Sequence, residues 1–210
     1  MKVNDMYCRH YGYTRIVDTD EHRSIGQLHA AWRKIATINM LLNDSHTDVV
    51  VLLDDDAYIN HYWIPVEYYL LQYKTHDIIA GVQHPDPPSR LHNINTGVMI
   101  IRNTMWSRAF FTSILSSDCN YTTQHCCWEQ DCIKHLLDRA DSWSRVAEIP
   151  AAEFNCQEKH RNYKGICDPY VWHAMGQGLK HLLEKPARIS LQKMTEKWET
   201  TRSLLNQAYI

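Results

Sequence analysis

The feature that most constrains the fold is an apolar run that ends abruptly in acidic residues. Residues 50–53, Val-Val-Leu-Leu, are followed directly by Asp54, Asp55 and Asp56. A short continuous run of valine and leucine is typical of a strand that is buried on both faces. Three neighbouring carboxylates at the end of such a strand repel one another, and a divalent cation is the simplest partner that offsets this repulsion.

Strands and helices are predicted to alternate along most of the chain. The predicted strands are at 14–19, 48–53, 77–83 and 96–103. The predicted helices are one that ends at Gly12 and others at 27–44, 63–74, 106–116, 128–139 and 192–207. This alternation indicates an α/β domain with a mostly parallel sheet, in which ligand-binding groups lie at the carboxyl ends of strands. The acidic triplet stands at such an end.

Asp54 and Asp56 are the first candidates for metal ligands. On an extended strand, residues two apart share a face, so both carboxylates can approach one cation. Hard oxygen ligands suit Mg²⁺ or Mn²⁺. Taken alone, the pair is explained equally well as a solvated acidic turn or as an N-cap for the next helix. The rest of the sequence therefore has to decide between these interpretations.

Size and charge exclude several other classes of protein. The chain has 210 residues and a formal net charge of −2, which fits one large domain. It contains no long basic run of the kind that binds nucleic acid. It also contains neither a stretch of eighteen apolar residues nor a signal peptide. We therefore expect a soluble, cytoplasmic chain without a membrane segment or a nucleic-acid partner.

The cysteines are expected to be reduced. Seven of them occur without regular spacing, which argues against a disulfide framework. Potential zinc ligands do crowd together, namely Cys119, His125, Cys126, Cys127, Cys132 and His135. Structural zinc sites usually show two well-spaced pairs, and no Cys-x-x-Cys pair occurs here. We therefore expect most of these cysteines to pack as small apolar residues.

Motifs on both sides of the acidic run follow the order of a known enzyme family. They are YCRHYGY at 7–13, WRK at 32–34, NTGVMIIRN at 95–103, EQD at 129–131, FN at 154–155 and VWHAMG at 171–176. Each motif alone is weak, but the ordered set resembles glycosyltransferase family 34, the metal-dependent retaining galactosyl-, xylosyl- and mannosyltransferases. The resemblance covers most of the chain. It implies a Rossmann-like glycosyltransferase A fold.

The same resemblance implies which residues bind the metal and the donor. Asp54, Asp56 and His173 would hold Mn²⁺ or Mg²⁺ beside the diphosphate of a nucleotide sugar, for which UDP is favoured. The expected donor-binding residues come from several segments. They are Lys34, Asp55, Asn95, Thr96, Gly97, Gly176 and Lys180. Lys34 is equally well explained as a solvated helix lysine, and Asn95 to Gly97 as a turn that enters a strand.

Glu129, Gln130 and Asp131 are the expected catalytic residues. By resemblance they lie near the reactive carbon, where one of them would stabilise positive charge, orient the acceptor or act as a nucleophile. The alternative is that they are acidic residues at a helix N-terminus that interact favourably with the helix dipole.

Two departures from the family pattern affect these expectations. The chain starts at the YCRHYGY motif, whereas the family fold opens with an earlier strand and helix that hold the base. Either Met1 is not the natural start or the fold runs without its first strand. More distant relatives carry a lysine six residues after the ligand histidine, where this chain has Leu179 followed by Lys180.

These observations predict a single domain over residues 1–210. Its nucleotide-binding half would span about 1–100 and its acceptor-facing half about 101–185, followed by a C-terminal helix at 186–210. The predicted reaction moves a hexosyl, pentosyl or deoxyhexosyl group from a nucleoside diphosphate sugar to a carbohydrate hydroxyl. The alternatives are an inactive or weak nucleotide-sugar-binding domain and a sugar nucleotidyltransferase. The resembling enzymes are often Golgi proteins, so the Golgi lumen is the alternative location if an N-terminal anchor is missing.

Overall fold

A computed structural model describes residues 2–19, 30–82, 92–116, 128–156 and 168–173. The helices are α1 (Lys2–Tyr11), η1 (Ala30–Trp32), α2 (Arg33–Leu42), α3 (Val66–Gln72), α4 (Met105–Ser116), α5 (Trp128–Arg139), η2 (Trp143–Arg145) and α6 (Ala151–Phe154), where η marks a 3₁₀ turn. The strands are β1 (Val49–Leu53), β2 (Ala57–Ile59), β3 (Ile78–Val82), β4 (Ile94–Arg102), β5 (Val146–Ile149), β6 (Asn155–Cys156) and β7 (Val171–His173).

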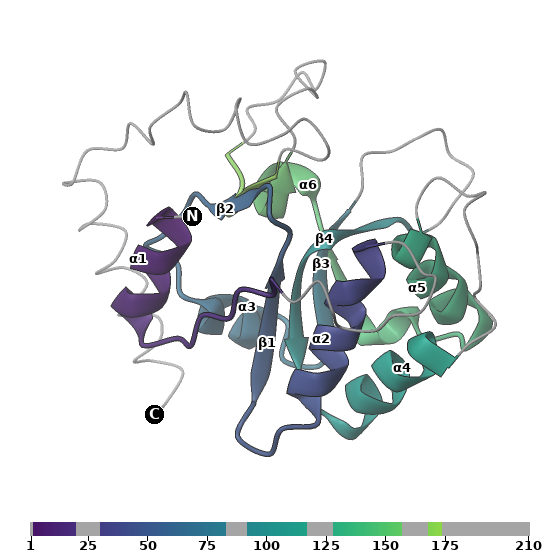
Figure 1. The fold of residues 1–210 in the computed structure, drawn as a ribbon. Coiled ribbons are helices and arrows are strands. Elements are labelled where there is room, and N and C mark those ends of the chain that lie inside the picture. The colour runs from purple at the N-terminus through teal and green to yellow at the C-terminus, as the bar shows by residue number, and fades with distance from the viewer. Residues whose placement is uncertain (1, 20–29, 83–91, 117–127, 157–167, 174–210) are drawn as a thin grey trace.

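Four strands form the main sheet, in the order β1–β4–β3–β5 (Figure 1). β4 is antiparallel to both β1 and β3, whereas β3 and β5 are parallel. β1, β3 and β5 therefore point one way and β4 points the other way. The predicted α/β class is confirmed. Three of the four strands run in the same direction, but only the pairing of β3 with β5 is parallel. Because β4 is inserted between two parallel strands, however, the pairings on both of its sides are antiparallel.

The antiparallel pairing of β1 and β4 determines where the site lies. Leu53, the last residue of β1, stands opposite Val98 near the start of β4. The acidic residues after β1 therefore lie next to the Asn-Thr-Gly segment at the start of β4.

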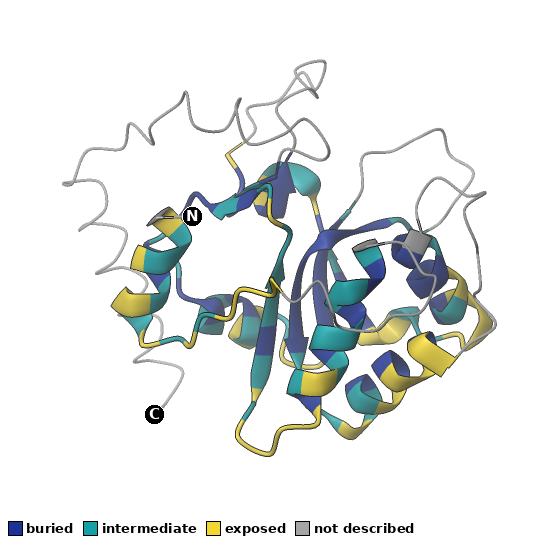
Figure 2. Ribbon diagram, viewed as in Figure 1, coloured by how far each residue is buried: buried dark blue, intermediate teal, exposed yellow. Residues whose placement is uncertain are grey.

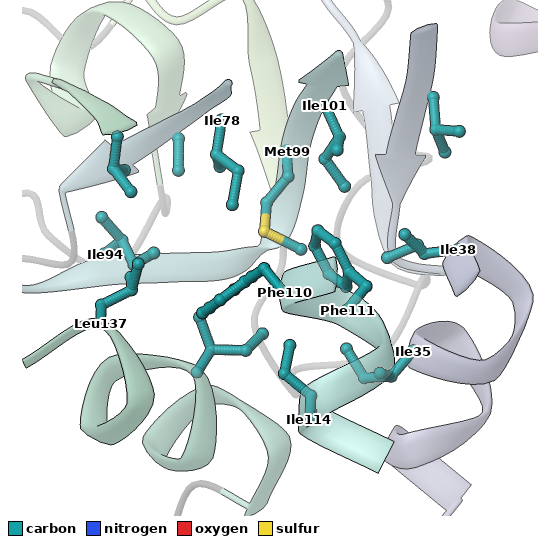
Figure 3. Close-up of a cluster of buried hydrophobic side chains, with 14 of the residues drawn as sticks. Ile35, Ile38, Ile78, Ile94, Met99, Ile101, Phe110, Phe111, Ile114 and Leu137 are labelled. Carbon is teal, nitrogen blue, oxygen red and sulfur yellow. The ribbon is translucent and has the colours of Figure 1, made fainter. Parts of the chain in front are cut away.

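Helices cover one face of the sheet, where α2, α4 and α5 pack against alternate residues of β3 and β4. Figure 3 shows the side chains that meet there, and Figure 2 shows that β4 is buried along nearly its whole length. The labelled residues of this cluster are Ile35, Ile38, Ile78, Ile94, Met99, Ile101, Phe110, Phe111, Ile114 and Leu137. Each such aliphatic or aromatic side chain contributes about 1.5–3 kcal/mol when fully buried, so this layer holds the helices to the sheet.

The opposite face of the sheet is covered by α1, α3 and a second, smaller sheet. That sheet has the order β2–β7–β6, in which β2 and β7 are antiparallel and Ala57 stands opposite His173. Tyrosines fill much of the space between the layers. Tyr7 and Tyr170, for example, are both buried and their hydroxyls are 2.7 Å apart. The second sheet thus fixes the end of β7 close to the end of β1.

Several predicted elements are confirmed, and one is wrong. The stop at Gly12 is confirmed: Gly12 has a φ of 73° and the next amide bonds back to the carbonyl of Cys8, the Schellman arrangement that ends many helices. The strand predicted at 14–19 is wrong, because these residues pair with no strand in the described part of the chain. Ile16 and Val17 remain about half exposed, since β-branched residues alone do not make a strand without a partner.

Other differences come from short elements. β2 and β5 have three and four residues, and the sequence pattern did not indicate either. The irregular segment expected after Pro150 does contain α6 and β6. The helix predicted at 192–207 lies outside the described residues. Among the described helices, none is both long enough and apolar enough to cross a membrane.

The expectation of reduced thiols is wrong for two cysteines. Cys132 on α5 and Cys156 on β6 each take part in a disulfide bond, whereas Cys8 on α1 is a free thiol. Spacing along the chain did not reveal this, because disulfide formation depends on distances in the fold rather than on regular intervals in the sequence.

Candidate metal centre and active site

A tight turn brings the two outer aspartates together. β1 ends at Leu53, and the amide of Ala57 donates a hydrogen bond to the carbonyl of Asp54 over 3.0 Å, which reverses the chain into β2. Asp55 stands exposed in this turn. The prediction that Asp54 and Asp56 approach a common point agrees with the structure, but the reason differs. They converge because of the turn, not because they alternate along a strand.

His173 completes a cluster of three potential metal ligands. Its Nε2 lies 3.0 Å from Oδ1 of Asp56 and 3.7 Å from Oδ2 of Asp54. The three residues offer ligand atoms that all lie within 4.8 Å of one another. Two carboxylates and an imidazole form a donor set that suits a borderline-hard divalent cation and leaves coordination positions for substrate oxygens. The three predicted ligands therefore lie close enough together that they could hold one metal ion.

Gly97 makes this arrangement possible. A Cβ atom at position 97 would lie 2.1 Å from Cε1 of His173 and 2.7 Å from Oδ2 of Asp54. The carbonyl of Gly97 also accepts a hydrogen bond from the amide of Asp54 over 2.8 Å. Gly97 was expected to be one of the residues that bind the donor. In the structure, the groups that approach it are two of the predicted metal ligands.

Lys34 on α2 joins this cluster to α5. Its Nζ lies 3.0 Å from Oδ1 of Asp54 and 2.7 Å from Oε1 of Glu129. Burial lowers the pKa of Lys34, but the two carboxylates outweigh burial and raise the pKa above its ordinary value. The ammonium group is therefore charged and offsets part of the negative charge of the site.

Glu129 and Gln130 are buried against the start of β4. Oε1 of Gln130 accepts a hydrogen bond from the amide of Thr96 over 2.9 Å, and the hydroxyl of Thr96 donates to Oε1 of Glu129 over 3.3 Å. Asp131, the third predicted catalytic residue, is half-buried on the same helix. The first turn of α5 is thus attached to the strand that carries Gly97.

Asn155 was not among the predicted site residues. Its side-chain amide donates to Oδ1 of Asn95 over 2.8 Å, and the same oxygen accepts from the amide of Gly97 over 3.0 Å. Asn155 is buried, and its own Oδ1 has no hydrogen-bond partner among the described residues. The sequence signal that could have identified Asn155 is the FN motif at 154–155, which is one of the motifs that resemble the family.

Two of the predicted donor-binding residues, Gly176 and Lys180, lie outside the described residues.

Comparison with known proteins supports the predicted family. A model of the nucleotide-diphospho-sugar transferase family matches residues 2–188. A glycosyltransferase involved in the glycosylation of the major capsid of PBCV-1 superposes with a TM-score of 0.60 at 17% identity, covering 96% of this chain and 89% of that one. At this identity the likeness shows a common fold.

Two more solved structures match less closely. The galactosyltransferase LgtC, crystallised with donor and acceptor sugar analogues, gives a TM-score of 0.48 at 14% identity and covers 80% of this chain and 66% of its own. GlyE from Streptococcus pneumoniae TIGR4 gives 0.48 at 12% identity, with coverage of 83% and 48%. No curated protein sequence matches the chain. Because the family model spans most of its length, the chain belongs to the family of nucleotide-diphospho-sugar transferases and is a glycosyltransferase.

Proposed function

We propose that this chain is a metal-dependent retaining glycosyltransferase that moves a sugar from a nucleoside diphosphate sugar to a carbohydrate hydroxyl. The single observation that carries the proposal is the cluster of Asp54, Asp56 and His173 in a chain of this family. Two carboxylates and one imidazole fit Mn²⁺ or Mg²⁺, and UDP is the favoured nucleotide.

The side chains around the cluster support this assignment. The cation, held by Asp54, Asp56 and His173, would neutralise the negative charge that develops on the leaving diphosphate. Gly97 leaves room for His173 and Asp54 beside the strand. Asn95, Thr96 and Gly97 would line the donor-sugar pocket, where the carboxamide of Asn95 offers groups for sugar hydroxyls.

Acidic and amide groups of α5 would act near the reacting carbon. Thr96 forms hydrogen bonds with the side chains of Glu129 and Gln130 and holds both in place. Binding of the donor therefore does not have to order these two side chains. Asp131 is half-buried and would be the member of the motif most accessible to substrate. In our assignment Asp55, Gly176 and Lys180 contact the donor. The nucleotide-binding half spans about residues 1–100, the acceptor-facing half about 101–185, and a C-terminal helix follows at 186–210.

The proposal is tested by nucleotide binding and by product analysis. In a thermal-shift panel with and without Mn²⁺, nucleoside diphosphate sugars should stabilise the chain more when Mn²⁺ is present, beyond the stabilisation by Mn²⁺ alone. The variants Asp56→Ala and His173→Ala should lose the Mn²⁺-dependent part of that stabilisation. Asp48→Ala and His46→Ala replace the same residue types at exposed positions before β1, so they serve as matched controls and should respond as the native chain does.

Product analysis then separates the possible reactions. Release of a nucleoside diphosphate with transfer of the sugar to a glycan acceptor supports the proposal, and the anomeric configuration of the product reports retention. Release of pyrophosphate would instead indicate a nucleotidyltransferase. Binding without any turnover or hydrolysis would indicate a nucleotide-sugar-binding domain. Equal Mn²⁺-dependent binding in the native chain and both cluster variants would refute the metal site.

A further inference from the structure

Lys34 contacts two carboxylates at once, and these belong to different parts of the site. One is on Asp54, a proposed metal ligand, and the other is on Glu129 in the first turn of α5. Only 15% of the Lys34 side chain and 6% of the Glu129 side chain are exposed. Charge-assisted hydrogen bonds are strong when both partners are withdrawn from water in this way. The ammonium group is therefore firmly held by protein atoms.

The two oxygens of Asp54 face different neighbours. Oδ1 is the oxygen nearer to Lys34, at 3.0 Å, against 3.3 Å for Oδ2. Oδ2 is the oxygen 3.7 Å from Nε2 of His173. The backbone of Asp54 is fixed separately, by the bond from its amide to Gly97. Since the backbone is fixed, the contact with Lys34 sets how the carboxylate is rotated.

We infer that Lys34 is a positioning residue for the metal. It holds Oδ1 of Asp54 so that Oδ2 is directed toward His173 and Asp56, while Glu129 keeps the ammonium in place from the other side. Thr96 in turn fixes Glu129 by donating to the oxygen that Lys34 contacts. Residues that orient a metal ligand without touching the metal typically change metal affinity 10- to 100-fold when they are removed. The inference rests on the proposed function only in requiring that Asp54, Asp56 and His173 bind a cation.

The decisive variant removes Lys34 and Glu129 together. Lys34→Met alone would leave the buried carboxylate of Glu129 without its cation and would also change the net charge beside the metal. In Lys34→Met/Glu129→Gln, one positive and one negative charge disappear together, so the long-range electrostatic effect on a cation cancels to first order. Methionine also keeps most of the apolar stem of the lysine. The rotation of Asp54 is then the main property that changes.

Mn²⁺ alone is the probe, and its binding is followed by the loss of the electron paramagnetic resonance signal of free Mn²⁺. The double variant should bind Mn²⁺ at least tenfold more weakly than the native chain. The control Glu129→Gln keeps the contact between Lys34 and Asp54 and removes one negative charge near the metal, so its dissociation constant should rise by no more than about threefold over the native value. Cooperative thermal unfolding checks that each variant is folded. If the double variant does not unfold cooperatively, Lys34→Leu/Glu129→Gln replaces it with the same expectation, because leucine also has no group that can bond to Asp54.

Three results would contradict the inference, and they are distinguishable. Suppose that the native chain binds Mn²⁺ and that the dissociation constant of a folded double variant is within twofold of the native value. Lys34 then does not position Asp54, while the proposed function stands. If the native chain itself does not bind Mn²⁺, the metal site is refuted and the inference fails with it. A tenfold loss in both the double variant and Glu129→Gln would assign the effect to Glu129 instead of Lys34.

Discussion

Gly97→Ala is the smallest change that should disable the proposed metal site. The added Cβ would lie 2.1 Å from Cε1 of His173, whereas ordinary contacts of this kind begin at 3.4 Å. Relief of the clash therefore needs a displacement of about 1.3 Å, shared between the imidazole ring and β4. His173 is 4% exposed and belongs to a paired strand, so little free space is available for that shift.

The magnitude follows from how little movement a metal site tolerates. Ligand distances are held to within about 0.2 Å, so a shift near 1 Å takes the imidazole nitrogen out of bonding range. Loss of one of three protein ligands should weaken Mn²⁺ binding by at least a factor of about 10–100, which corresponds to about 1.4–2.8 kcal/mol. Overpacking of a close contact should also reduce the free energy of unfolding by about 1–3 kcal/mol.

Gly12→Ala provides the matched control. Gly12 has a φ of 73°, which disfavours alanine, but a Cβ there meets no atom within 4 Å. This variant should lose about 1–2 kcal/mol of stability through backbone strain, with no effect on Mn²⁺ binding. Thermal unfolding and Mn²⁺ titration are measured on both variants. If Gly97→Ala binds Mn²⁺ as tightly as the native chain, or if Gly12→Ala loses binding equally, the geometric reasoning is wrong.

Three further outcomes are expected from the structure. Burial raises the pKa of Tyr7 and Tyr170 in the folded chain. Above pH about 10 both tyrosines therefore ionise in the unfolded chain but stay protonated in the folded one, so the free energy of unfolding should fall as the pH rises further. Denaturant midpoints between pH 8 and 11 measure this loss, and the change from pH 8 to pH 11 should be smaller for Tyr7→Phe than for the native chain. Reduction with dithiothreitol should lower the melting temperature, since loss of a disulfide typically costs about 2–5 kcal/mol, and an unchanged melting temperature would show that the bonds of Cys132 and Cys156 do not stabilise the fold. Saturating Mn²⁺ at about 100 times its dissociation constant should add about 2.7 kcal/mol of stability, which a chelator should remove, while no change at that concentration would contradict native-state binding.

Patterns in the sequence predicted the large elements of the fold well. The apolar runs that became β1, β3 and β4 were located to within two residues, because strands buried on both faces, as β3 and β4 are, must be continuously apolar. The expectation of burial on both faces is wrong for β1, an edge strand in which only Val50 is buried. The position of β4 between β1 and β3 could not be read in this way. Strand order depends on which chain segments meet in space, and apolar periodicity carries no information about it.

The residues of the candidate site were predicted better than the contacts between them. Asp54, Asp56 and His173 were named from motifs, and the structure brings them together. The link from Lys34 to Glu129 was missed, because a lysine on a helix looks the same in a sequence whether it points to solvent or to a buried carboxylate. The orphan oxygen of Asn155 was missed for the same reason, since only the packing shows that it is buried.

The pairing of β2 with β7 has a further consequence for the kinetics of unfolding. It places position 173 beside position 57, so the proposed ligands come from segments that are far apart along the chain. A cation shared by Asp56 and His173 would close a loop on the order of 100 residues, as a disulfide between those positions would. Unfolding would then require either release of the ion or separation of the two small strands while they remain cross-linked. Bound metal is therefore expected to slow the separation of β2 from β7, and the metal-bound protein should resist proteolysis at these two strands.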